Sequence, residues 1–267
     1  MFPPFIKIKK TALDILFPPV CLNCQDYLNT PDGLICKNCL STIKIHNSLF
    51  CPICGLRLFK DKKICNHERK KSDKYPYFLG AATNYDNDAI RNLIHYFKYK
   101  SFKNIAPLLG NILVNYTELI GFQPKDYVIT PIPLHPRKEK QRGFNQSELL
   151  SKFLAEHYNL PVIDSLKRVR HTEPQARFNK SKRKISLLDG ISEILEDGSE
   201  ISENYEKRRK NISGAFSITD TNEIKGKNII LIDDVYTSGA TMSEAARILK
   251  AGGAKKIIAL VVAKTQS

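Results

Sequence analysis

The feature that most constrains this 267-residue chain is the thirteen-residue string from Ile229 to Thr241. It opens with an apolar run typical of a buried parallel strand, continues into Asp233 and Asp234, and ends in a loop of small and hydroxylated residues. Apolar residues then recur at helical spacing until Gly252. A strand, an acidic pair, a small-residue loop and a helix in this order predict an anion site with carboxylates on its rim.

The start of the helix is predicted from Thr241 and Glu244, which stand three residues apart as in a capping box. The backbone N–H groups of the loop, its hydroxyls and the helix dipole would all face a phosphate. A side chain larger than glycine at position 239 would block that approach. The candidate phosphate-binding residues of this loop are Thr237, Ser238, Gly239, Ala240 and Thr241.

The acidic pair alone would also fit the start of a polar turn, because two acids after a strand are common. The complete string closely resembles the phosphoribosyl-pyrophosphate (PRPP) binding motif of type I phosphoribosyltransferases: an apolar strand, two acids, an apolar residue, any residue, and T-S-G-x-T. On this reading Asp233 and Asp234 are the candidate catalytic residues, and they would hold ribose hydroxyls or a phosphate-bound Mg²⁺.

The charge of the chain favours polyanionic partners. Lys and Arg number 42 and Asp and Glu 27, which gives a formal net charge of +15. Nucleic acid, an acidic membrane surface and highly phosphorylated substrates all fit such an excess. No apolar run approaches the roughly 18 residues of a membrane span, and the first ten residues lack the features of a signal peptide. A cytoplasmic location is therefore expected.

All seven cysteines lie between positions 21 and 65, which favours metal binding over disulfides. The pairs Cys21-x-x-Cys24 and Cys36-x-x-Cys39 have the spacing of a zinc ribbon, so a structural Zn²⁺ held by four thiolates is expected. The cysteine-rich module is assigned to residues 1–75.

A third pair, Cys51-Pro-Ile-Cys54, is followed by Cys65 and His67. These four side chains could complete a second tetrahedral zinc site. The alternative is that Cys65 and His67 are ordinary surface residues, and the two readings differ in the number of zinc ions that they predict.

From residue 78 onward, strand patterns alternate with helical patterns, which favours an α/β domain built on a mainly parallel sheet flanked by helices. This domain is assigned to residues 76–267. The first strand is expected at 78–85. In the next helix an apolar stripe at helical spacing is formed by Ile90, Leu93, Ile94 and Phe97.

A basic face shared by Arg91, His95 and Lys98 lies on the same helix, and aromatic residues alternate with Lys100 and Lys103 just after it. The cations Arg91, Lys98, Lys100 and Lys103 are weak candidates for nucleic-acid contacts, with the aromatics stacking on bases. The basic face of Arg91, His95 and Lys98 could equally meet pyrophosphate, and a solvated helix face explains the pattern as well as either ligand does.

A second candidate loop follows the strand that begins at Tyr127. It carries Arg137, Lys138, Lys140 and Arg142 just before Asn145, where another helix is expected to start. Ligands of open α/β sheets bind outside the carboxyl ends of the strands. This cationic loop and the Asp233 loop are therefore predicted to face one ligand.

The strings P-I-P-L-H-P-R and R-G-F-N-Q around this loop, the cysteine-rich N-terminal region and the PRPP motif together resemble the competence protein F family. The resemblance implies a zinc-ribbon module joined to a phosphoribosyltransferase-like domain, with Arg137, Lys138 and Arg142 on the pyrophosphate side. It also implies a role in DNA uptake during natural transformation. The chain departs from the family pattern in an acidic segment, 185–206, which is interpreted as a surface insertion.

Two functions follow as hypotheses. The first is a PRPP-binding protein of DNA uptake that handles imported single-stranded DNA, with a helicase or recombination mediator as a further partner. The alternative is an active phosphoribosyltransferase that acts on an unidentified acceptor and is unrelated to competence.

Overall fold

The computed structural model describes residues 19–29, 33–58, 76–99, 102–170 and 211–265. Several sequence predictions fall outside these described residues: the second-site ligands Cys65 and His67, the cation Lys100 and the acidic segment 185–206.

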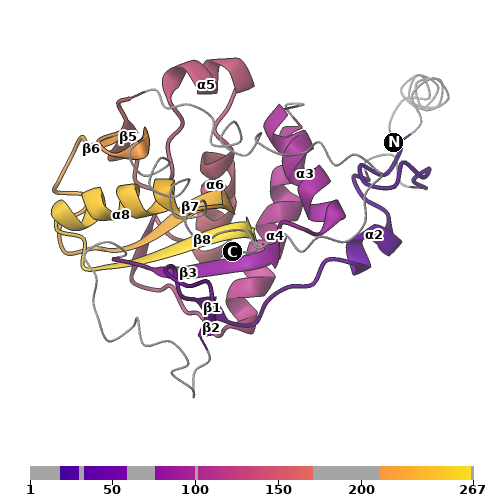
Figure 1. The fold of residues 1–267 in the computed structure, drawn as a ribbon, viewed down its shortest axis with the longest axis horizontal. Helices are drawn as coiled ribbons and strands as arrows, with labels where there is room; N and C mark the ends of the chain where they lie inside the picture. The colour runs from indigo at the N-terminus through magenta and orange to yellow at the C-terminus, as the bar shows by residue number, and fades with distance from the viewer. Residues whose placement is uncertain (1–18, 30–32, 59–75, 100–101, 171–210, 266–267) are drawn as a thin grey trace, which may run out of the picture.

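A six-stranded sheet forms the centre of the protein, with strand order β2-β1-β3-β8-β7-β4 (Figure 1). Neighbouring strands among β3, β8, β7 and β4 are parallel, whereas β1 pairs antiparallel with both β3 and β2. The sheet is thus mainly parallel, as predicted. Its strands are β1 (Leu49–Phe50), β2 (Arg57–Leu58), β3 (Phe78–Asn84), β4 (Tyr127–Pro131), β7 (Asn228–Tyr236) and β8 (Lys256–Lys264).

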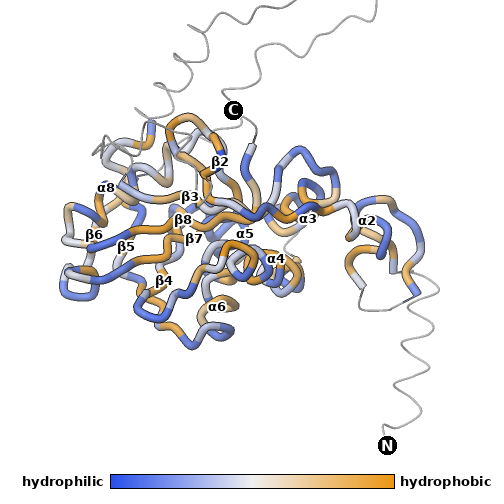
Figure 2. Tube along the Cα trace, turned by 90° about the horizontal axis from the view of Figure 1, so that it is seen from below, coloured by the Kyte–Doolittle hydropathy of each residue, from blue (hydrophilic) through white to orange (hydrophobic). Residues whose placement is uncertain are grey.

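Helices cover both faces of this sheet, with α4 and α6 on one side and α8 on the other (Figure 2). Successive residues of β7 point to opposite faces: Ile230 and Ile232 enter the core beneath α4 and α6, and Ile229 and Leu231 enter the core beneath α8. Burial on both faces is why this strand reads as an unbroken apolar run. The helices are α2 (Lys37–Ser41), α3 (Asp88–Tyr99), η2 (Lys103–Ile105), α4 (Ala106–Leu119), α5 (Pro136–Arg142), α6 (Gln146–Tyr158) and α8 (Ala240–Ala251).

Helix α3 is the element that carries the predicted apolar stripe, and every member of that stripe is fully buried. The helix is capped by Asn87, whose Oδ1 accepts a hydrogen bond from the backbone N–H of Ile90 at 3.0 Å. Asn87 also donates through Nδ2 to the carbonyl of Thr42 at 3.0 Å. The start of α3 is therefore tied to the N-terminal segment.

The N-terminal segment also joins the main sheet directly, through β1 and β2. The backbone N–H of His46 donates to the carbonyl of Ala82 at 2.8 Å, and the Tyr116 hydroxyl donates to the carbonyl of Ser48 at 2.8 Å. The two strands that flank the third cysteine pair thus belong to the main sheet, so part of the segment assigned to the zinc module packs as an edge of the larger domain.

The start of α8 differs from the sequence prediction. The helix begins at Ala240, its N-cap is Gly239 without a side-chain cap, and Thr241 lies inside the first turn. Glu244 does not close a capping box, because its Oε1 accepts from the backbone N–H of Gly214 at 2.7 Å and its carboxylate pairs with Arg247. The capping-box prediction was wrong because a tertiary partner takes the glutamate.

A second, two-stranded sheet stands apart from the main one. It pairs β5 (Leu166–Arg168) antiparallel with β6 (Phe216–Ile218). Within the described ranges, no helix is long and apolar enough to cross a membrane.

Candidate functional site

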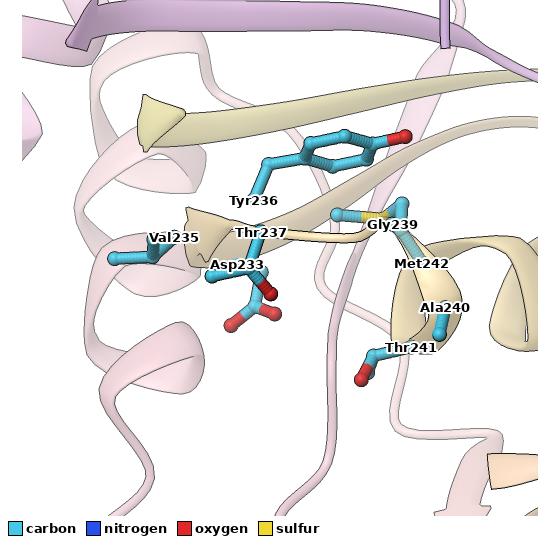
Figure 3. A pocket seen from close by; sticks show the side chains of 8 residues that line it. All are labelled: Asp233, Val235, Tyr236, Thr237, Gly239, Ala240, Thr241 and Met242. Atoms are coloured by element: carbon cyan, nitrogen blue, oxygen red, sulfur yellow. The ribbon is translucent and has the colours of Figure 1, made fainter. Parts of the chain in front are cut away.

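A small hollow lies at the C-terminal end of β7, where the strand passes into α8. Figure 3 shows the Asp233 carboxylate and the hydroxyls of Thr237 and Thr241 on one side of the loop, with the ring of Tyr236 on the other. The hollow is lined by Asp233, Val235, Tyr236, Thr237, Gly239, Ala240, Thr241 and Met242. The structure thus brings four of the five predicted loop residues, and the first acid, around one cavity.

Gly239 is required by the shape of the loop. Its φ angle is +72°, a left-handed conformation that other residues adopt only at a cost. A Cβ at this position would lie 2.1 Å from the Tyr236 hydroxyl oxygen. The side chain of Ser238 contributes a buried Oγ that has no hydrogen-bond partner among the described residues. Ser238 does not line the hollow, so its hydroxyl lies beside the cavity rather than in it.

Asp233 is half-buried and lines the hollow. Its Oδ1 accepts hydrogen bonds from the Ser147 hydroxyl at 3.0 Å and from the backbone N–H of Asp234 at 2.9 Å. Burial and the adjacent Asp234 carboxylate raise the pKa of Asp233 to about 6, although Lys98 and the two hydrogen bonds act in the opposite direction. The first acid is therefore a carboxylate whose charge the fold accommodates at a cost.

Asp234 lies differently from its neighbour, because it is buried and does not line the hollow. Its Oδ1 forms an ion pair with the Nζ of Lys98 at 2.8 Å. Burial alone would lower the pKa of the Lys98 ammonium, but the pairing with Asp234 outweighs it and raises that pKa. The sequence predicts Lys98 on a basic helix face that would meet pyrophosphate, nucleic acid or solvent. The structure places its ammonium inside the site instead.

The remaining cations of α3 and its surroundings lie at the surface. Arg91 is exposed and forms an ion pair with Asp88 in the first turn of α3. Lys103 is exposed, and its ammonium lies 5.4 Å from the centre of the Phe144 ring. These two cations are accessible to a polyanion.

The segment after β4, predicted as a cationic loop, folds instead into the short helix α5. Lys138 is half-buried, and its pKa falls to about 8 because of burial and the neighbouring charges of Arg168 and Arg142. The Arg142 guanidinium donates to Gln146 Oε1 at 2.9 Å, whereas the Arg137 side chain is exposed. Lys138 and Arg142 therefore belong to one cluster of positive charge, and Arg137 lies at its margin.

Two further side chains of this candidate site, Ser147 and Arg168, were not among the predicted site residues. Asp233 counteracts the burial-driven fall in the pKa of the Arg168 guanidinium, which places the β5 arginine within electrostatic reach of the acid. Ser147 lies in the first turn of α6, two residues after the helix cap Asn145. Its place near that predicted helix start is the one local signal for it in the sequence. Arg168 lies on a three-residue strand with no motif around it.

The sulfur atoms of Cys21, Cys24, Cys36 and Cys39 lie within 4.8 Å of one another. Backbone N–H groups of Asn23 and Cys36 each donate to Cys21 Sγ at 3.4 Å. Four convergent thiols with amide hydrogen bonds to sulfur have the donor set of a structural zinc site. The predicted first site is therefore supported as a structural zinc centre.

The third cysteine pair repeats the backbone geometry of the first. Gly55 donates to the carbonyl of Cys51 at 2.9 Å and Ile53 to Cys51 Sγ at 3.4 Å, as Gln25 and Asn23 do around Cys21 at 3.0 and 3.4 Å. Gly55 and Gln25 both have positive φ angles, +68° and +65°. Two of the four predicted second-site ligands thus sit in a loop shaped like the first knuckle.

Two protein-family models match separate parts of the chain. Residues 12–67 match the family described as a double zinc ribbon domain, and residues 185–267 match the phosphoribosyl transferase domain family. The second match contains all the residues that line the hollow.

Three curated proteins are similar to this chain over most of its length. Competence protein ComFC of Bacillus subtilis is 27% identical over 237 residues, which cover 84% of this chain and 80% of the relative. Competence protein F of Haemophilus influenzae is 26% identical over 242 residues, covering 89% and 93% of the two chains. DNA utilization protein YhgH of Salmonella typhimurium is 26% identical over 246 residues, covering 90% and 94%.

The raised pKa of Asp233 predicts a pH-dependent cost to stability. Between about pH 4, the ordinary pKa of aspartate, and pH 6, the folded protein retains a proton that the unfolded chain has lost, so stability falls as the pH rises through this window. Asp233→Asn removes this cost and keeps the Oδ1 acceptor. We expect the variant to be more stable than the wild type at pH 7.5 by roughly 1–3 kcal/mol, with the difference vanishing toward pH 4.

The measurement is thermal unfolding between pH 4 and 8 for both proteins. The exposed acid Asp126, changed to Asn, is the matched control and should show no such trend. A stability difference that is constant across the pH range would contradict the prediction.

Proposed function

Because this chain resembles the competence protein F proteins over most of its length, we propose that it acts in DNA uptake, binds PRPP with Mg²⁺ at the β7–α8 loop and handles single-stranded DNA. The observation that carries the proposal is the hollow at the end of β7, with one carboxylate, two hydroxyls and a left-handed glycine around it. The names of the relatives, competence protein and DNA utilization protein, support the cellular role.

Both the phosphate groups and the hydroxyls of a phosphorylated sugar have suitable partners around this hollow. The N-terminal end of α8 presents backbone N–H groups and the positive end of a helix dipole, which favour the 5-phosphate. Lys138 and Arg142 supply positive charge for the pyrophosphate group. Asp233 is left to accept hydrogen bonds from ribose hydroxyls, which neither the amides nor the cations can do.

The residues present also fit a magnesium ion carried by the ligand. Mg²⁺ is usually held by one or two carboxylates together with phosphate oxygens, and Asp233 is the acid that faces the hollow. The ion would neutralise charge on the pyrophosphate. Lys138, Arg142 and Arg168 would hold the same group electrostatically.

The surface next to this site has the composition of a single-strand binding platform. Tyr99 and Phe102 expose 62% and 42% of their area, and the Arg142 guanidinium lies 5.3 Å from the centre of the Tyr99 ring. Exposed aromatic rings interleaved with cations stack on bases and attract the phosphate backbone. Arg91 and Lys103 extend the positive charge along this surface.

The zinc content follows from the repeated knuckle geometry. We infer that Cys51 and Cys54 bind a second Zn²⁺ together with two ligands outside the described residues, for which Cys65 and His67 are the candidates. The matching hydrogen bonds around Cys21 and Cys51 support this inference, as does the match of residues 12–67 to a double zinc ribbon.

PRPP binding is tested by calorimetry in the presence of Mg²⁺. The wild type should bind PRPP, and Asp233→Ala/Asp234→Ala should abolish the heat because the carboxylate that faces the hollow and the buried partner of Lys98 are both lost. Asp126→Ala, at the opposite end of β4, is the control and should bind as the wild type does. Wild-type heat no greater than that of the double variant would overturn the proposal. Pyrophosphate release on adding a nucleobase would instead favour the alternative, an active transferase.

Single-stranded DNA binding should depend on the exposed aromatics and on salt. We expect Phe102→Ala to weaken oligonucleotide affinity roughly 5- to 100-fold, as the loss of a stacking side chain does, and affinity to fall steeply with salt. Phe78→Ala is a matched control, because Phe78 is 41% exposed at the far end of β3. Equal affinities for both variants in fluorescence anisotropy would contradict a stacking role for Phe102.

Metal analysis of the purified protein tests the zinc assignment. About two zinc ions per chain are expected in the wild type, and about one in Cys51→Ser, because tetrahedral sites with three protein ligands hold zinc less firmly. Cys36→Ser provides the comparison for the first site. A wild-type content of one ion, unchanged in Cys51→Ser, would remove the second site.

A further inference from the structure

We propose that Lys98 is a positioning residue that divides the acidic pair into two roles. Lys98 holds Asp234 inside the protein, so that Asp233 is the carboxylate that meets the ligand. The same contact fixes the end of β7, from which the loop between β7 and α8 departs. The proposal deepens the proposed function, and it rests on that function where it refers to PRPP. The positioning of the loop itself does not require the ligand.

The geometry separates the two acids clearly. The Lys98 ammonium lies 2.8 Å from Asp234 Oδ1, and the two side chains expose only 20% and 7% of their area. Asp233 lines the hollow, whereas Asp234 is absent from its lining. A ligand entering the hollow therefore meets the first carboxylate, and the second is already occupied.

Helix α3 holds the lysine firmly in place. Lys98 directly follows Phe97, the fully buried end of the apolar stripe. At the other end of the helix, Asn87 bonds to Thr42, and Asn92 Nδ2 donates to Asn23 Oδ1 at 2.9 Å. The ammonium is thus presented by an element anchored both in the core and on the zinc module.

The charge balance gives this contact its importance. Two adjacent carboxylates at one strand end repel each other, and the burial of Asp234 leaves water little access to it. Removing one partner of a buried ion pair leaves an uncompensated charge, which is strongly unfavourable. Without Lys98, Asp234 would be left as a buried, uncompensated carboxylate beside Asp233, close to the end of β7 from which the loop departs.

A purely structural role is the competing explanation, because many buried ion pairs can be replaced by apolar residues without loss. The two explanations differ in what the pair does to the loop. If Lys98 positions Asp234, its loss must change the order of the loop and the affinity for PRPP, and both changes must depend on Asp234.

The experiment is a double-mutant cycle of Lys98→Met, Asp234→Asn and the combined variant. Two quantities are measured: hydrogen exchange of the amides of residues 235–241 without ligand, and PRPP affinity with Mg²⁺. We expect each single change to speed exchange and to weaken affinity by about tenfold or more, and the combined variant to lose far less than the product of the two, because neither buried charge is then left unpaired.

Two further variants guard the interpretation. Lys98→Arg keeps the charge and should retain most of the affinity. Lys152→Met breaks an exposed lysine–glutamate pair on α6 and should change neither quantity. Should Lys98→Met fail to fold, Lys98→Gln takes its place in the cycle.

The outcomes separate this proposal from the proposed function. Additive effects in the combined variant, or a Lys98→Met protein that behaves like Lys152→Met, would overturn the positioning role. The third outcome combines coupled effects on hydrogen exchange among the variants with a wild-type protein that shows no heat on adding PRPP. This outcome would uphold the positioning role while refuting PRPP binding.

Discussion

The parallel pairing of β7 between β4 and β8 is the constraint on which the site depends. All three strands end at the same edge of the sheet, so the loops that follow β7 and β4 meet there even though about a hundred residues separate them in sequence. The acids enter from β7, and the cations of α5 enter after β4. Opposite charges that no local pattern connects are brought together by the strand order.

Two neighbouring carboxylates at such an edge repel each other, and this repulsion must be compensated by other contacts. The compensating contacts differ between the two carboxylates. Asp234 has a cation from α3, while Asp233 has hydrogen bonds from Ser147 and from the backbone, and these leave its pKa raised. A carboxylate held at a cost in this way gains more from a ligand that donates hydrogen bonds or carries a cation than a fully satisfied one would.

The sequence was informative wherever the signal is local. The stripe on α3, the Asn145 cap of α6 and the end of α8 at Gly252 depend on spacing along one element, and the structure confirms each of them. The ends of helix α5 also carry a local signal in the sequence: Pro136 stands at the first helical position, and Gly143 follows the last one. In the structure Gly143 has a φ angle of +79°, as a glycine at a helix end commonly does.

Local spacing could not predict the roles of residues whose partners lie far away in the sequence. Glu244 matched a capping box and instead binds Gly214, from a segment thirty positions earlier in the chain. Lys98 matched an exposed basic face and instead reaches a strand that begins at residue 228. In both cases the helical spacing alone does not distinguish an exposed polar side chain from a buried one. Only the packing of α3 and α8 against the sheet decides which polar side chain is buried against a partner.

The same packing explains how the cysteine-rich segment contributes to the ligand site. The Tyr236 hydroxyl donates to the carbonyl of Pro52 at 3.1 Å, inside the third cysteine knuckle, and lies 3.2 Å from the Tyr77 hydroxyl. Because the Tyr236 ring occupies the space beside Gly239, this contact fixes the outer wall of the hollow from the N-terminal side. Lys98 holds the inner side from a helix that is itself tied to the first knuckle through Asn23. The cysteine-rich segment therefore supports the loop at two points, which gives a physical reason for a zinc ribbon and the proposed phosphate site to occur in one chain.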